Sequence, residues 1–173
     1  MNDVSKLIWL NKEYLNQAVQ LIESLDDASY VQCDSQYYSS GIGDHLRHIV
    51  EHYQLFLDGI LSGLIDYDAR KRDLLLSSQR NYAMTAIQEV QNSMDEIPKT
   101  CRTIQVKMMS SAEDELNSAL SESSVSRELH YLQAHTIHHF ALIATILRLQ
   151  GVEPHPDFGV APSTLKHRQS QLA

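Results

Sequence analysis

The stretch that decides the fold is VSRELHYLQAHTIHHFALIATILRLQ, residues 125–150. Its apolar residues recur at a spacing of three to four, which predicts one long amphipathic helix. Serines precede the stretch and can cap its start, and Gly151 follows it as a C-terminal cap. Three histidines, His135, His138 and His139, lie within this apolar run. Because a polar ring buried without partners is costly, their presence indicates that this helix does more than pack.

Three further stretches show the same helical period, at residues 4–25, 40–63 and 68–97, and Pro98 ends the last of them. With 6 glycines and 4 prolines in 173 residues, the chain has few helix breakers. Four helices of this length predict an all-α fold, a four-helix bundle, in a single domain spanning residues 1–173.

The connection between the third and fourth predicted helices is long. Residues 103–109 alternate well enough for a short strand, and residues 116–120 could return as its partner in a short hairpin. A connection of this length also permits a crossover, and hence an up-down-down-up order of the helices. From about residue 152 we expect an irregular tail that lies along the bundle surface.

Composition narrows the class of partner. The net charge of -8 argues against nucleic acid, because an acidic chain repels the phosphate backbone. Cys33 and Cys101 provide no disulfide framework. The first residues lack a signal-peptide pattern, and no stretch reaches the roughly 18 apolar residues of a membrane span. We therefore expect a cytoplasmic protein with no membrane partner.

Most of the histidines fall into two groups. In the helix at 125–150, His135 and His139 are four positions apart on the apolar face, so both should point into the core. The second group consists of His45, His48 and His52, which span an arc of about 60° beside the apolar face of the helix at 40–63.

An i, i+4 histidine pair can hold a metal ion from one helix face, and a catalytic site needs about three protein ligands. Any histidine of the second group could be the third ligand, provided that the two helices are neighbours. The alternative is a set of hydrogen-bonded core histidines without a metal, which is the usual role of a single buried histidine.

GIGDHLRHI at residues 41–49, followed by HTIHH at residues 135–139, resembles the DinB-like superfamily of metal-dependent enzymes. The resemblance covers essentially the whole chain and implies an up-down-down-up four-helix bundle that forms a homodimer. Many relatives continue HHRGQ after the histidines. This chain has Phe140 and Leu142 at the arginine and glutamine positions, so contacts of those two side chains do not carry over.

The same resemblance implies that His48, His135 and His139 bind a divalent metal ion, either Zn, Ni or Fe. It implies a small-molecule substrate, with a low-molecular-weight thiol among the candidates. The leading hypothesis is a metal-dependent thiol S-transferase or hydrolase, in which the metal activates the thiol or water. His52 or His138 would be the catalytic residue that accepts a proton or orients a ligand, and His52 could also be a fourth ligand.

A rival hypothesis is a non-catalytic bundle that binds a metal, senses a ligand or forms a structural dimer. Three carboxylates near the histidines, Asp44, Glu51 and Glu128, could orient a ligand ring, although a solvated position is the simpler expectation for each. Arg127 could bind an anionic substrate, but a surface ion pair with an acid in the first helical turn is the simpler expectation.

Overall fold

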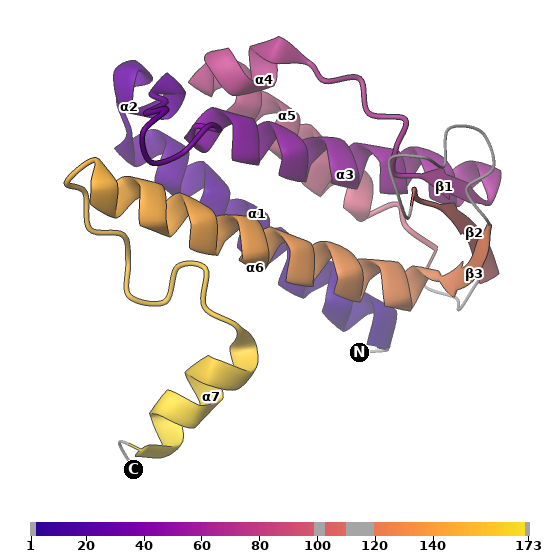
Figure 1. Ribbon diagram of the computed structural model, residues 1–173. Helices are drawn as coiled ribbons and strands as arrows, with labels where there is room; N and C mark the ends of the chain where they lie inside the picture. The colour runs from indigo at the N-terminus through magenta and orange to yellow at the C-terminus, as the bar shows by residue number, and fades with distance from the viewer. Residues whose placement is uncertain (1–2, 99–102, 110–119, 172–173) are drawn as a thin grey trace.

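The computed structural model describes residues 3–98, 103–109 and 120–171 (Figure 1). Its four long helices are α1 (Asp3–Ser24), α3 (Ile42–Ser62), α5 (Arg80–Met94) and α6 (Val125–Leu149). Three shorter helices are α2 (Asp27–Val31), α4 (Leu74–Ser78) and α7 (Pro162–Gln171). The expectation of a mainly helical protein is confirmed, and the structure adds a small three-stranded sheet.

The long helices pack side by side, with α6 against α1 and α3, and α5 against the same two helices. Helix α3 ends just before the sheet and α6 begins just after it, so these two helices run in opposite directions (Figure 1). Helix α5 also runs towards the sheet, whereas α1 runs alongside α6 in the same direction. The interface of α3 with α6 is the one that brings the two histidine groups together.

A buried polar network fixes the spacing of three of these helices. Asn11 of α1 donates through Nδ2 to the carbonyl oxygens of Leu7, at 2.8 Å, and Leu129 of α6, at 3.1 Å. The Tyr53 hydroxyl of α3 donates to Asn11 Oδ1 at 2.7 Å and lies 3.2 Å from the Thr136 hydroxyl of α6. Since Asn11 and Tyr53 have no exposed surface, these bonds replace those that water would supply.

The sheet lies at the end of the helices where α3 stops and α6 starts. It contains β1 (Leu64–Asp66), β2 (Thr103–Lys107) and β3 (Ser121–Ser124) in the order β1-β2-β3. Strand β1 is parallel to β2, with Ile65 opposite Val106, and β2 is antiparallel to β3.

The expected hairpin is confirmed in its first strand. The described strand that returns beside β2 is Ser121–Ser124, directly after the expected range of residues 116–120. Leu120 is outside any strand, and residues 116–119 lie outside the described part of the chain. Strand β1 was not expected, because three residues are too few to show a period and their extended form depends on pairing with β2.

The third predicted helix is also shorter than its periodicity indicated. Residues 68–73 precede the short helix α4, which Asp73 caps by accepting a hydrogen bond from the Leu75 amide at 2.9 Å. The connection that returns the chain along the molecule therefore lies between α3 and α5 (Figure 1). In the tail, which was expected to be irregular, residues Pro162–Gln171 form α7, with no buried side chain. Within the described ranges, no helix is both long and apolar enough to cross a membrane.

Replacement of Asn11 tests the buried network. Asn11→Ala removes three hydrogen bonds and leaves their partners buried, so the free energy of unfolding should fall by about 2–4 kcal/mol in urea denaturation. Asn92→Ala, at an exposed position of α5, is the matched control and should change the stability by less than about 0.5 kcal/mol. Equal effects of the two substitutions would contradict the role given to Asn11.

Candidate metal centre

Five imidazole rings meet between α3 and α6. Helix α3 contributes His45, His48 and His52, and α6 contributes His135 and His139. The spacings of three and four residues place each group on one helix face, so the expectation that both groups meet is fulfilled. The ring of His48 lies 4.3 Å from that of His52, 4.9 Å from that of His135 and 4.6 Å from that of His139, measured between centroids.

Three of these histidines lie close enough together to hold a metal ion. One ring nitrogen from each of His48, His52 and His135 lies within 4.8 Å of the other two. Two of the residues that the resemblance implied, His48 and His135, therefore belong to this trio, together with His52. His139 adjoins it, since its ring centroid is 4.6 Å from that of His135.

Hydrogen bonds determine which nitrogens remain free. His52 Nδ1 lies 2.8 Å from the His48 carbonyl oxygen, and because that oxygen only accepts, Nδ1 carries the proton and Nε2 keeps its lone pair. His135 Nε2 is buried and has no hydrogen-bond partner among the described side chains. A buried nitrogen left without a partner, on a ring that lies beside other imidazoles, fits a metal ion of the kind that neutral nitrogen ligands bind.

His139 and His45 form a pair of their own. Their Nδ1 atoms are 2.9 Å apart, so one ring donates and the other accepts. If His139 is the donor, its Nε2 is free to act as a ligand. His45 then orients the His139 ring, as a hydrogen-bond acceptor commonly does for a metal-bound histidine. His138 lies further out, with its ring 5.3 Å from that of His139.

The electrostatics of the cluster keep its rings neutral. Burial, followed by the charges of neighbouring groups, lowers the pKa of His48 to about 2, of His139 to about 3 and of His135 to about 4. Burial also lowers the pKa of His45 and His52. Because a metal ion binds neutral imidazole and not imidazolium, the lowered pKa values favour metal binding at neutral pH.

Two tyrosines wall the cluster on the side of the sheet. The ring of Tyr67 stacks on that of His52 at 5.4 Å, and the ring of Tyr131 stacks on that of His135 at 5.5 Å. Burial raises the pKa of both hydroxyls, so both remain protonated. The Tyr67 hydroxyl donates to Glu128 Oε2 at 2.8 Å, which holds its ring in place.

The three carboxylates near the histidines form hydrogen bonds with groups outside the cluster. Asp44 accepts a hydrogen bond from the Gly41 amide at the start of α3. The expectation of solvated positions is wrong for Glu51 and Glu128, which are 2% and 0% exposed, because the segment after β1 covers the first and the sheet covers the second. Glu128 also forms an ion pair with Arg127 at 2.9 Å, as expected of an acid in the first turn.

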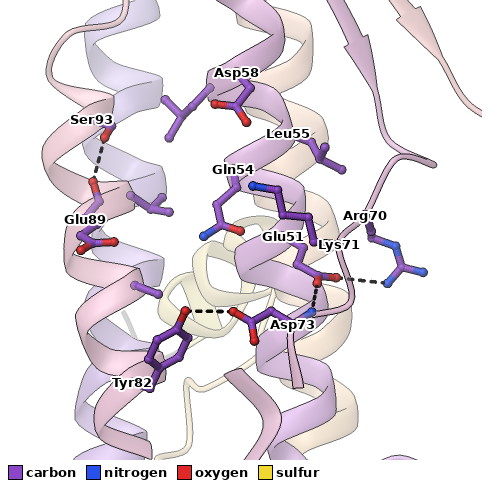
Figure 2. Close-up of a pocket in the computed structure, with 13 residues that line it drawn as sticks. Glu51, Gln54, Leu55, Asp58, Arg70, Lys71, Asp73, Tyr82, Glu89 and Ser93 are labelled. Carbon is purple, nitrogen blue, oxygen red and sulfur yellow. Dashed lines mark hydrogen bonds and ion pairs between the residues drawn. The ribbon is translucent and has the colours of Figure 1, made fainter. Parts of the chain in front are cut away.

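Sequence reasoning missed Arg70. Its Nη1 atom lies 2.6 Å from His48 Nδ1 and 3.7 Å from Glu51 Oε2. Arg70 and Glu51 both line a cavity of about 360 Å³ between α3 and α5. Figure 2 shows the ion pair of Arg70 with Glu51. No local pattern could have identified this arginine, because it reaches the cluster only when the chain returns along α3.

The fold and its histidine cluster define a class of protein: a mainly helical domain with a candidate metal centre between two helices. The DinB family model matches residues 1–166, and the chain belongs to the DinB family. This is a metal-binding family, in agreement with the three neighbouring histidines.

One relative is FK506-binding protein 5 of the fungus Rhizopus delemar, which is 32% identical over 111 residues. The match covers 62% of this chain and 28% of that protein, so the chain spans little more than a quarter of the relative's length. No solved structure matches the chain.

The lowered pKa values predict how the metal-free protein responds to acid. The unfolded chain takes up protons at histidine near pH 6.5, whereas in the folded protein His135 takes one up only near pH 4 and His139 only near pH 3. The stability contributed by the neutral rings is therefore complete above about pH 6.5 and is lost as the pH falls towards 4.

We expect the Tm of the metal-free protein to fall when the pH is lowered from 7.5 to 5, as measured by circular dichroism. His135→Asn should reduce this fall, while His130→Asn, at an exposed position of the same helix, should leave it unchanged. A Tm that is constant or rises over this range would contradict the assignment of neutral rings.

Proposed function

We propose that this protein is a metal-dependent enzyme that acts on a small molecule, as a thiol S-transferase or a hydrolase. The observation that carries the proposal is the buried His135 Nε2, which has no hydrogen-bond partner in the described chain and belongs to a ring grouped with those of His48 and His52. A structural histidine would satisfy its buried nitrogen with a protein partner, so an unpaired one favours a bound ion.

His48 and His135 are common to both possible ligand sets. The family resemblance indicates His139 as the third ligand, whereas the distances between ring nitrogens indicate His52. We propose His48, His135 and His139 as the ligands, with His52 either a fourth ligand or the proton acceptor. Neutral nitrogen ligands suit Zn, Ni and Fe(II) alike.

A divalent ion, when bound, lowers the pKa of a thiol or water beside it, so that a nucleophile is available near neutral pH. The neutral imidazoles favour this chemistry because they leave the charge of the ion uncompensated. His52 Nε2 keeps its lone pair, so it can accept the proton that the nucleophile releases, and His138 is the second candidate for this role. Tyr67 and Tyr131 shield the rings of His52 and His135 from water on one side.

Membership of the family supports the finer features of the proposal. These are the up-down-down-up four-helix bundle, a homodimer, a cytoplasmic location and a low-molecular-weight thiol as substrate. The helix directions in Figure 1 agree with the first of them. The net charge of -8 supports a partner other than nucleic acid.

Metal analysis tests the centre. Protein purified without a nickel column should contain about one divalent ion per chain, because three converging imidazoles suffice to hold it. His48→Ala and His135→Ala should each abolish binding, and the comparison of His139→Ala with His52→Ala identifies the third ligand. His130→Ala, exposed on α6, is the control and should retain the metal. Full metal content in both His48→Ala and His135→Ala would refute the assignment.

Turnover separates an enzyme from a metal-binding sensor. A panel of low-molecular-weight thiols with an electrophilic acceptor, and a panel of esters, should reveal activity that a chelator removes and added metal restores. His52→Ala should lower kcat by about 100-fold or more if His52 is the proton acceptor. No turnover with any substrate, together with tight binding of a metal, would favour the non-catalytic alternative.

A further inference from the structure

The contact between Arg70 and His48 bears on whether His48 can bind a metal at all. We propose that Arg70 and Glu51 form a positioning pair that controls His48: the guanidinium must leave His48 and move to Glu51 before His48 can act as a ligand. This inference rests on the proposed metal centre.

The argument begins with the proton on His48. An arginine side chain only donates hydrogen bonds, so at 2.6 Å the Arg70 Nη1 group donates to Nδ1 and occupies its lone pair. The neutral ring then carries its proton on Nε2. Both nitrogens are thereby engaged, and His48 has no lone pair to give to a metal while Arg70 remains in place.

Glu51 is the alternative acceptor. Its Oε1 atom accepts a hydrogen bond from the Asp73 amide at 2.8 Å, which fixes the carboxylate (Figure 2). Its Oε2 atom is buried, has no hydrogen-bond partner in the described ranges and lies 3.7 Å from Arg70 Nη1. A short movement of the guanidinium would give this oxygen the partner that a buried carboxylate requires.

The surroundings favour this movement when a cation occupies the histidine cluster. Both Arg70 and Glu51 belong to the lining of the cavity between α3 and α5, and Figure 2 shows the Arg70 guanidinium beside the Glu51 carboxylate. Three further carboxylates line the same cavity, Asp58, Asp73 and Glu89, against the one other cation in its lining, Lys71. A divalent ion near His48 would repel Arg70, and this acidic cavity would attract it.

A double-mutant cycle on zinc affinity tests the pair, with a chromophoric chelator as the competitor. Arg70→Met should bind zinc about tenfold more tightly than the unmodified chain, because a charge-assisted hydrogen bond no longer competes for His48. Glu51→Gln should bind zinc about tenfold more weakly, because the amide retains the acceptor for Asp73 but offers the guanidinium no charged partner. In the Arg70→Met background, Glu51→Gln should have no effect on zinc affinity.

Lys71→Met is the matched control for charge. It removes a cation from the lining of the same cavity, so its zinc affinity should change by less than about twofold if contact with His48 is what matters. An increase equal to that of Arg70→Met would overturn the proposal, since net charge alone would then explain both. The proposal would also be overturned if Arg70→Met bound zinc no more tightly than the unmodified chain. The same holds if Glu51→Gln still weakened zinc binding in the Arg70→Met background.

Nitrogen NMR of the unmodified chain gives a readout that does not depend on any variant. The metal-free protein should show His48 with its proton on Nε2, and zinc should change this pattern. A proton on Nδ1 in the metal-free protein would refute the proposal. If the unmodified chain binds no zinc, the proposed metal centre itself fails, which is a different result from zinc binding that is indifferent to Arg70.

Discussion

The structure depends on the packing of five imidazole rings between α3 and α6, of which His52 and His139 are buried and His45, His48 and His135 are half-buried. Each ring has two nitrogens in a site that is partly shielded from water, so each nitrogen needs a hydrogen-bond partner or a metal ion there. His52 finds one on its own helix, His45 and His139 satisfy each other, and His48 receives Arg70. His135 Nε2 is left without a partner in the described structure. Four of the five rings therefore have a hydrogen-bond partner for one nitrogen, and the buried nitrogen without a partner belongs to the trio that could hold an ion.

Neighbouring elements hold the two helices at the distance that this cluster requires. The network of Asn11, Tyr53 and Thr136 joins α1, α3 and α6 through the core. At the other side, the sheet positions Tyr67 on His52, and Glu128 anchors the hydroxyl of that tyrosine. Precision at the histidines therefore comes from contacts outside them, which is how a rigid site is built.

The distribution of charge has a consequence for the chemistry. The chain carries a net charge of -8, but the buried carboxylates nearest the cluster accept hydrogen bonds from groups outside it. Glu51 accepts from the Asp73 amide, and Glu128 accepts from the Tyr67 hydroxyl. The nitrogens of the trio remain neutral donors. A divalent ion there would keep its full charge and act strongly on a bound thiol or water. The only guanidinium placed against a ring of the trio in the described chain belongs to Arg70, which is itself balanced by Glu51.

The sequence by itself determined the long helices and the two histidine faces. A period of 3.6 residues is a local property, so the spacing of apolar residues located α1, α3 and α6 closely and showed that His135 and His139 face inward. The resemblance of two short motifs then indicated the family and the metal. Within the cluster, spacing placed His45 and His52 closer to the apolar face of α3 than His48, whereas the resemblance selected His48.

Only the tertiary structure decided how those histidines are used. Strand β1 exists because β2 pairs with it, and the segment after β1 brings Tyr67 and Arg70 back along α3. The contact of Arg70 with His48 joins residues 22 positions apart and has no signature in either stretch. Which nitrogen holds a proton, and which is left unpaired, depends on such contacts across elements, and local periodicity contains no information about them.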